Sequence, residues 1–148
     1  MSMLMDDGQA AKVLLSVLAQ INRRMMTMRT SLDARPEVRT ANRTCDILDY
    51  HDPMDPEDKF CDFEAYIEAE TSTGEFCWSL ELRAKAETWE VHRRISVAQE
   101  AGGETVTDFP DVSFESFELF VLGALPLVDE FAESTKNFDF SSRRIGNE

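Results

Sequence analysis

The segment 61–70 constrains the fold more than any other part of this chain, because small or apolar residues alternate in it with polar ones. The odd positions are Cys61, Phe63, Ala65, Ile67 and Ala69, and the even positions are Asp62, Glu64, Tyr66, Glu68 and Glu70. Side chains two residues apart share one face of a strand, so the pattern predicts a strand that is buried on one face and wet on the other. The wet face is almost entirely anionic. Carboxylates that share a face repel one another unless they are hydrated or meet cations, so we expect this face to be a binding surface.

Two further runs of alternating residues follow this strand. After turn residues at 71–74, apolar side chains recur at every second position, namely Phe76, Trp78, Leu80, Leu82 and Ala84. In the third run the shared apolar face consists of Trp89, Val91, Ile95 and Val97, and Arg93 interrupts it. Alternating runs joined by turns predict antiparallel hairpins, and residues 104–107 favour a short fourth strand. The chain therefore predicts an antiparallel meander of three to four strands, with one apolar face that helices must cover.

Two segments show the period of a helix. Between residues 9 and 31, apolar residues recur at intervals of three and four, namely Val13, Leu14, Val17, Leu18, Ile21, Met25 and Met28. After Ser113, the expected N-cap, a second stripe consists of Phe114, Phe117, Val121, Leu125, Val128 and Phe131. These stripes predict amphipathic helices, and Gly123 and Pro126 predict a kink or a break near Leu125. The expected fold class is α+β, with the meander covered by a long N-terminal helix and a kinked C-terminal helix.

The remaining segments carry weaker patterns. Prolines and aspartates dominate residues 32–59, which predicts a loop with at most one short strand at 45–50. From about residue 135 the chain has no helical stripe and is expected to fray, although Phe138 and Phe140 favour docking as an edge strand. A length of 148 residues and a hydrophobic content of 43% suit one compact domain, residues 1–148.

The charge of the chain restricts its partners. Twenty-nine acidic residues against fifteen basic ones give a formal charge of −14, and residues 49–75 contain ten carboxylates and a single cation, Lys59. Such a field repels phosphate backbones and anionic lipids, so nucleic-acid binding and attachment to a membrane surface are disfavoured. Basic proteins are the expected partners. Solubility alone is the other interpretation of this charge.

Cysteine usage and the first residues favour a cytoplasmic protein. Three cysteines, Cys45, Cys61 and Cys77, show no CxxC spacing, which argues against a disulfide framework and against a zinc site of the usual spacing. The N-terminal residues lack the basic and apolar runs of a secretory signal, and no stretch reaches the about 18 apolar residues of a membrane span.

No pattern in the sequence predicts catalysis or a cofactor. His51 and His92 are the two histidines, and no spacing brings either together with metal ligands or a nucleophile. Serine nucleophile elbows and phosphate-binding glycine loops are absent. Glu64 and Glu68 have similar wet surroundings, whereas paired catalytic carboxylates need different ones. A calcium site is an alternative for the loop aspartates Asp49, Asp52, Asp55 and Asp58, but their spacing does not match a calcium-binding loop. We therefore expect that the protein is not an enzyme.

Tyr66 completes the predicted binding surface. An aromatic ring among carboxylates combines a rigid apolar anchor with charge, as interface hot spots do. The expected partner-binding residues are Asp55, Glu57, Asp58, Glu64, Tyr66, Glu68 and Glu70. In size, charge and helix-sheet-helix plan, the chain resembles the immunity proteins that protect bacteria from polymorphic or contact-dependent toxins. These proteins share no common motif, so the resemblance carries no residue over. It implies a cytoplasmic inhibitor that occludes the functional site of a basic toxin.

Three other interpretations stay open. Effector chaperones of type III secretion are also small, acidic and of mixed α/β structure. A small enzyme or ligand-binding domain would need a pocket between sheet and helices that contains Arg93 and His92. Finally, Arg83, Arg93 and Arg94 could neutralise the carboxylates of the first strand across the sheet, which would make the acidic face purely structural.

Overall fold

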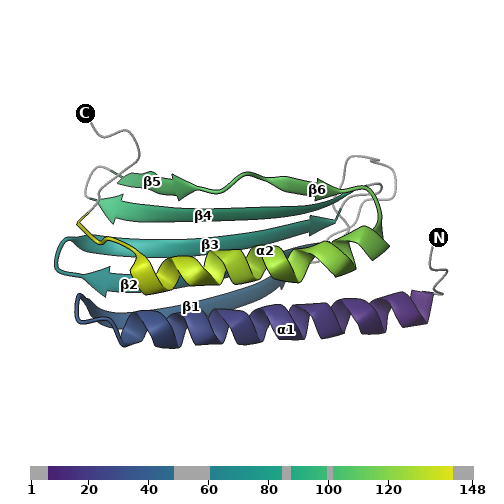
Figure 1. Ribbon diagram of the computed structural model, residues 1–148, viewed down its shortest axis with the longest axis horizontal. Helices are drawn as coiled ribbons and strands as arrows, with labels where there is room; N and C mark the ends of the chain where they lie inside the picture. The colour runs from purple at the N-terminus through teal and green to yellow at the C-terminus, as the bar shows by residue number, and fades with distance from the viewer. Residues whose placement is uncertain (1–6, 49–60, 85–87, 100–101, 142–148) are drawn as a thin grey trace.

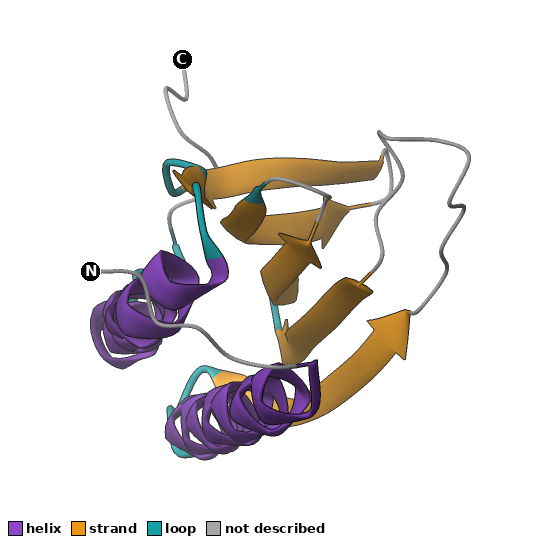
Figure 2. Ribbon diagram, turned by 90° about the vertical axis from the view of Figure 1, so that its right-hand side faces the viewer, coloured by secondary structure: helices purple, strands orange, loops and turns teal. Residues whose placement is uncertain are grey.

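The computed structural model describes residues 7–48, 61–84, 88–99 and 102–141. It consists of two layers, an antiparallel sheet and a pair of helices that pack side by side on one of its faces (Figure 1; Figure 2). The elements in chain order are α1 (Asp7–Asp33), β1 (Val38–Leu48), β2 (Cys61–Thr71), β3 (Gly74–Ala84), β4 (Trp89–Gln99), β5 (Gly102–Asp108), β6 (Val112–Phe114) and α2 (Phe117–Asn137). The predicted α+β class is confirmed.

The sheet has six strands, more than the predicted three to four. Strands β1 to β5 lie in sequence order, each antiparallel to its neighbours, and β6 also pairs with β4. Residues 94–99 of β4 pair with β5, and residues 89–91 pair with β6. The chain leaves the ladder between them, at residues 109–111, so two short strands share one edge of β4.

The predicted loop at 32–59 is wrong for residues 38–44, which belong to β1, whereas residues 45–48 form the described part of the short strand predicted at 45–50. Ala41 is 3% exposed beneath α1, and Arg29 of α1 donates from Nε to the Ala41 carbonyl oxygen at 3.0 Å. Arg43 donates to the Asn22 side-chain oxygen of α1 at 2.5 Å. The helix thus packs along the edge strand, where strand groups would otherwise be exposed. Because Ala41 and Arg43 are the side chains that this part of β1 turns toward α1, the sequence there shows no alternation of large apolar and polar residues.

The core lies between the sheet and the two helices. Its largest fully buried side chains include Trp78, Phe76, Phe120, Phe131, Ile21, Met25, Met28, Leu32 and Ile67. Trp78 on β3 also makes a polar contact, since its indole Nε1 donates to Ser134 Oγ of α2 at 2.9 Å. The apolar faces predicted for the three central strands and for the first helix are confirmed.

The second helix begins later than predicted. Residues 112–114 form β6, and Ser116 rather than Ser113 is the N-cap of α2. The Ser116 hydroxyl oxygen accepts a hydrogen bond from the Leu119 amide at 3.2 Å, which satisfies one of the free amides at the start of the helix. Phe114, predicted on the helix, lies on a strand instead, because an aromatic residue suits a half-buried strand equally well.

The helix α2 runs without interruption through Gly123 and Pro126 to its end, so the predicted break into two helices is wrong. Ala124 and Val128 are fully buried on either side of Pro126, so both halves of the helix pack against the core. Gly123 serves a different purpose. A Cβ at this position would lie 2.7 Å from Cζ of Phe114, so the absent side chain lets α2 approach β6 closely.

The residues after α2 dock as aromatic side chains and not as the predicted edge strand. The Phe140 ring packs edge-on against Phe76 at a centroid distance of 5.1 Å, and Phe138 does the same against Trp78 at 5.1 Å. Arg35, between α1 and β1, donates to the Phe138 carbonyl oxygen at 2.7 Å. A cation bound to carbonyl groups at a helix C-terminus stabilises the helix end.

Arg93 is buried on the apolar face of β4, where the sequence places it, with 3% of its surface exposed. Its Nη1 donates to Glu130 Oε1 at 2.7 Å and to the Leu127 carbonyl oxygen at 3.2 Å, both on α2. Its Nη2 donates to the Pro110 carbonyl oxygen at 3.1 Å, and the guanidinium lies 5.0 Å from the centre of the Phe109 ring. One side chain thus connects the sheet, α2 and the link between β5 and β6.

The close approach of α2 and β6 predicts the effect of Gly123→Ala. Alanine favours a helix over glycine by about 1 kcal/mol, but its Cβ collides with Phe114, so we expect a net loss of about 1–2 kcal/mol in the free energy of unfolding. Urea denaturation measures this loss. The double variant Gly123→Ala, Phe114→Leu is the control and should recover part of the stability; a stabilised single variant would contradict the close packing.

The contacts of Arg93 predict that Arg93→Ala lowers the free energy of unfolding by about 3 kcal/mol, because buried hydrogen bonds and packing are both lost. Its acidic partner Glu130 is 63% exposed, so Glu130→Gln should cost less than about 1 kcal/mol. Urea titrations of the two variants compare these values, and a small loss for both would mean that Arg93 does not tie α2 to the sheet.

Candidate functional site

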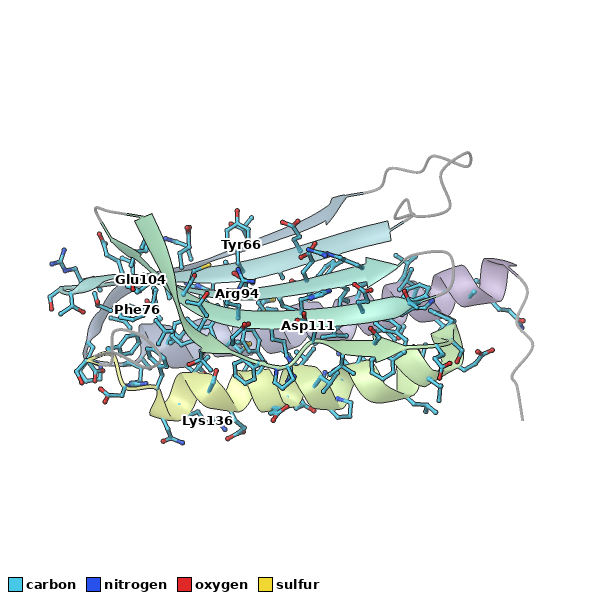
Figure 3. All side chains as sticks on the ribbon, turned by 90° about the horizontal axis from the view of Figure 1, so that it is seen from above. Tyr66, Phe76, Arg94, Glu104, Asp111 and Lys136 are labelled. Carbon is cyan, nitrogen blue, oxygen red and sulfur yellow. The ribbon has the colours of Figure 1, made fainter. Side chains whose placement is uncertain are left out.

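The face of the sheet that turns away from both helices is the candidate site, and it is termed the outer face (Figure 3). Its described side chains on β2, β3 and β4 are Glu64, Tyr66, Glu68, Glu70, Glu75, Cys77, Ser79, Glu81, Arg83, Glu90, His92, Arg94 and Ser96. They alternate along each strand with the buried residues of the core. Because neighbouring strands are in register, these side chains form rows that cross the sheet.

Four of the predicted contact residues lie together on this face, along β2, and form the acidic strip: Glu64, Tyr66, Glu68 and Glu70. Glu70 is exposed and the other three are half-buried. In the register of β2 and β3, Glu64 lies opposite Glu81, and Glu70 lies opposite Glu75. Like charges directly opposite each other destabilise a sheet. Glu81 is paired with Arg83, so the repulsion across the two strands concerns the exposed pair Glu70 and Glu75.

The other predicted contact residues, Asp55, Glu57 and Asp58, lie outside the described residues. The same holds for His51 and for Asp49 and Asp52 of the proposed calcium loop. In the part of the chain that is described, no three His, Cys, Asp or Glu side chains form a group that could hold a metal ion.

The arginines of β3 and β4 have different acidic partners. Arg83 donates from Nε and Nη2 to the two carboxylate oxygens of Glu81 on its own strand, both at 2.8 Å. Arg94 Nε lies 3.9 Å from Asp108 Oδ1 of β5. Arg93 belongs to the opposite, buried face, so it does not reach the carboxylates of β2 on the outer face.

His92 lies between two carboxylates on the outer face. Its Nε2 is 3.0 Å from Glu90 Oε1, and its Nδ1 is 2.9 Å from Asp111 Oδ1 in the link between β5 and β6. Both contacts are hydrogen bonds at the same time only when both ring nitrogens carry a proton. His92 thus lies on the wet face of β4, and the fold gives it two acidic partners that the sequence did not predict.

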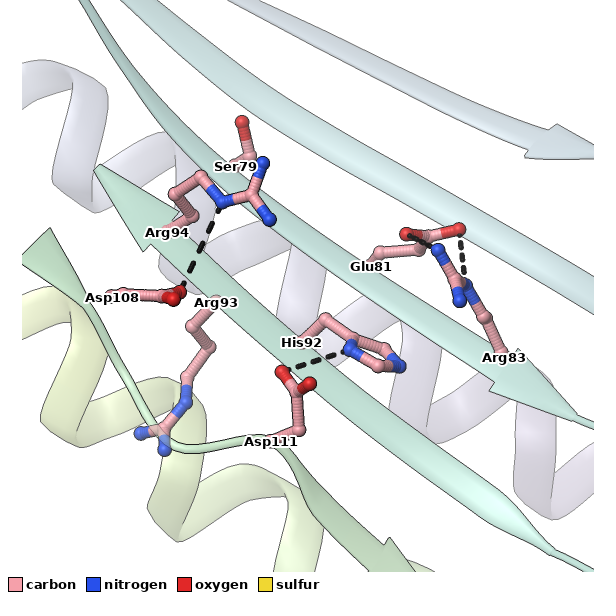
Figure 4. Close-up of a pocket in the computed structure, with 8 residues that line it drawn as sticks. All are labelled: Ser79, Glu81, Arg83, His92, Arg93, Arg94, Asp108 and Asp111. Carbon is pink, nitrogen blue, oxygen red and sulfur yellow. Dashed lines mark hydrogen bonds and ion pairs between the residues drawn. The ribbon is translucent and has the colours of Figure 1, made fainter. Parts of the chain in front are cut away.

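A shallow depression of about 170 Å³ opens beside His92 on the outer face (Figure 4). The residues that line it are Ser79, Glu81, Arg83, His92, Arg93, Arg94, Asp108 and Asp111. Arg93 borders it, but the Arg93 guanidinium points to the buried face, so this depression on the outer face is not the predicted pocket between sheet and helices. Most charged groups around it already bind one another, which favours a contact surface over a ligand pocket.

Cys77 lies on β3 opposite Glu68 of the acidic strip. Burial raises the pKa of the Cys77 thiol above its ordinary value, and the nearby Glu68 and Glu75 carboxylates raise it further. No sequence pattern indicates that Cys77 lies beside Glu68, because this neighbourhood depends on the register of β2 and β3. Cys77 can report on the electrostatics of the strip.

Comparisons of the chain with protein-family models, with curated proteins and with solved structures find no match. Over the described ranges, neither helix is both long enough and apolar enough to span a membrane.

The raised pKa of Cys77 predicts slow alkylation. In a variant with Cys45→Ser and Cys61→Ser, iodoacetamide should modify Cys77 more slowly than a thiol in a short peptide at the same pH, because the thiolate fraction is smaller. Adding Glu68→Gln and Glu75→Gln should raise the rate only modestly, since burial is the larger cause. Mass spectrometry over a pH series measures both effects, and a rate equal to that of the peptide would contradict them.

Proposed function

We propose that this protein is a stoichiometric inhibitor of the immunity-protein type, which binds a basic toxin through its outer face and covers the toxin's functional site. The observation that carries the proposal is the acidic strip, in which carboxylates of β2 face carboxylates of β3 on a side of the sheet that neither helix covers. The repulsion between the exposed Glu70 and Glu75 costs stability in the free protein. A cationic partner surface offsets that cost in the complex.

The proposed mechanism is occlusion aided by electrostatic attraction. The formal charge of −14 raises the rate of encounter with a basic protein, and the strip then orients it. Tyr66, half-buried at the centre of the strip, supplies the apolar contact that charge alone lacks. A toxin that acts on nucleic acid or nucleotides has a basic cleft, and a rigid acidic sheet competes for that cleft with the substrate.

The rigidity of the face supports this mechanism. The acidic strip lies on a strand with a neighbour on each side, and Trp78 and Ile67 pack directly beneath it in the core. Side chains on such a support lose little conformational freedom on binding, so more of the interaction energy appears as affinity.

Charge reversal tests the surface. The triple variant Glu64→Lys, Glu68→Lys, Glu70→Lys should remain folded and bind its partner about a hundredfold more weakly, a loss of about 3 kcal/mol. The control variant Asp33→Lys, Glu115→Lys, Glu133→Lys has the same net charge, but its changes lie at the ends of the helices and on α2. It should bind nearly as tightly as the wild type.

The measurement begins with capture of the partner from lysate of the source organism by the tagged protein, at low and high salt. The captured protein is then purified, and its affinity for the three forms is measured by calorimetry. One basic partner in a one-to-one complex that salt weakens is the expected result. Equal affinity of a folded triple variant and the wild type would place the interface elsewhere.

A further inference from the structure

Arg94 occupies the centre of the outer face. In the register of the sheet, Arg94 of β4 lies opposite Ser79 of β3, and Ser79 lies opposite Tyr66 of the acidic strip. Two strand spacings therefore separate Arg94 from Tyr66, a backbone distance of about 10 Å. Figure 4 shows the Arg94 guanidinium beside Ser79, whose small side chain leaves the space above β3 open. A cation thus stands next to the surface that the proposed function assigns to a basic partner.

Arg94 is bound more loosely than the other cations of this face. Arg83 makes two hydrogen bonds of 2.8 Å, and His92 contacts two carboxylates at 2.9 and 3.0 Å. The Arg94 ion pair with Asp108 is 3.9 Å long, and the two side chains are 60% and 61% exposed. An exposed pair of this length contributes little to stability, so Arg94 can form new bonds with a partner at little cost to the fold.

A uniformly acidic face has a specificity problem. It attracts every polycation in the cell by the same long-range force, and discrimination between partners needs an unfavourable contact with the wrong ones. A cation about 10 Å from the acidic strip supplies that contact, because a surface covered evenly with lysines places one of them against it.

We propose that Arg94 determines the specificity of the outer face, and that the face fits a basic protein surface which carries a carboxylate opposite Arg94. This inference rests on the proposed function and names the chemistry of its partner. Arg94 donates to the partner carboxylate in a charge-assisted pair, while the partner's cations meet the acidic strip. A second copy of this chain does not fit, because it would set one acidic strip against another on molecules that each carry a formal charge of −14.

Two synthetic peptides test the inference: a lysine undecapeptide, and the same peptide with glutamate at its central position. The variant is Arg94→Glu. Its control is Arg23→Glu on the exposed side of α1, and each substitution makes the formal charge of −14 more negative by two. Affinities are measured by calorimetry at low ionic strength, where a charge change at about 10 Å has its full effect.

The expected result is that Arg94→Glu binds the all-lysine peptide about fourfold more tightly than the wild type does, whereas Arg23→Glu changes this affinity less than twofold. The central glutamate should weaken binding to Arg94→Glu at least fourfold more than it weakens binding to the wild type. This difference is the coupling between Arg94 and the peptide carboxylate. Equal effects of Arg94→Glu and Arg23→Glu on both peptides would overturn the inference.

The triple variant of the acidic strip, tested with the same peptides, separates the two proposals. If it loses affinity for the all-lysine peptide and Arg94→Glu behaves like its control, the acidic strip remains the binding surface and only the role of Arg94 is wrong. If the triple variant binds that peptide as tightly as the helix-side control variant does, the outer face is not the cation-binding surface and both proposals fail.

Discussion

The buried guanidinium of Arg93 is the interaction on which the arrangement of the sheet edge depends. A cation with 3% exposure is costly unless its donors are satisfied; here Nη1 binds α2 and Nη2 binds the link between β5 and β6, while Nε makes no hydrogen bond with the described residues. The adjacent His92, on the opposite face of β4, contacts Asp111 in the same link. Two successive side chains thus hold residues 109–111 from both sides of the sheet. This explains why the chain leaves the ladder there and returns to pair as β6.

Both helices lie on one face of the sheet, and this arrangement determines which face is accessible to a partner. The helices cover the apolar face, and Trp78 and Arg93 bind α2 by hydrogen bonds as well as by packing. The outer face is then the large, rigid surface that no described helix covers. Its charges are unevenly distributed, with carboxylates on β2 and mixed, mostly paired charges on β3 and β4. The proposed inhibitor function relies on this uneven distribution of charge.

The parts of the fold that the sequence predicts well are those in which burial and periodicity agree. In α1, apolar side chains recur at intervals of three and four residues, and in β2, β3 and β4 they alternate with polar ones. The first pattern is buried on one face of a helix and the second on one face of a strand. The first part of β1 and the whole of β6 were missed for a physical reason. The first part of β1 covers its core side with Ala41 and Arg43, and β6 is three residues long, so neither carries a periodic signal. Their pairing is decided by neighbours that are distant in the sequence.

For the candidate site, too, some features follow from the sequence and others only from the fold. The sequence alone determined that Glu64, Tyr66, Glu68 and Glu70 share one wet face, because a two-residue period is a local property of the backbone. Only the tertiary structure decided which residues lie beside them. On β3 these neighbours are Glu75, Cys77 and Glu81, and on β4 Arg94 lies beyond Ser79 of β3. Register between strands and the choice of sheet face for the helices depend on how the whole core packs. Electrostatic partners on a sheet therefore follow from the fold, whereas the face of each residue follows from the sequence.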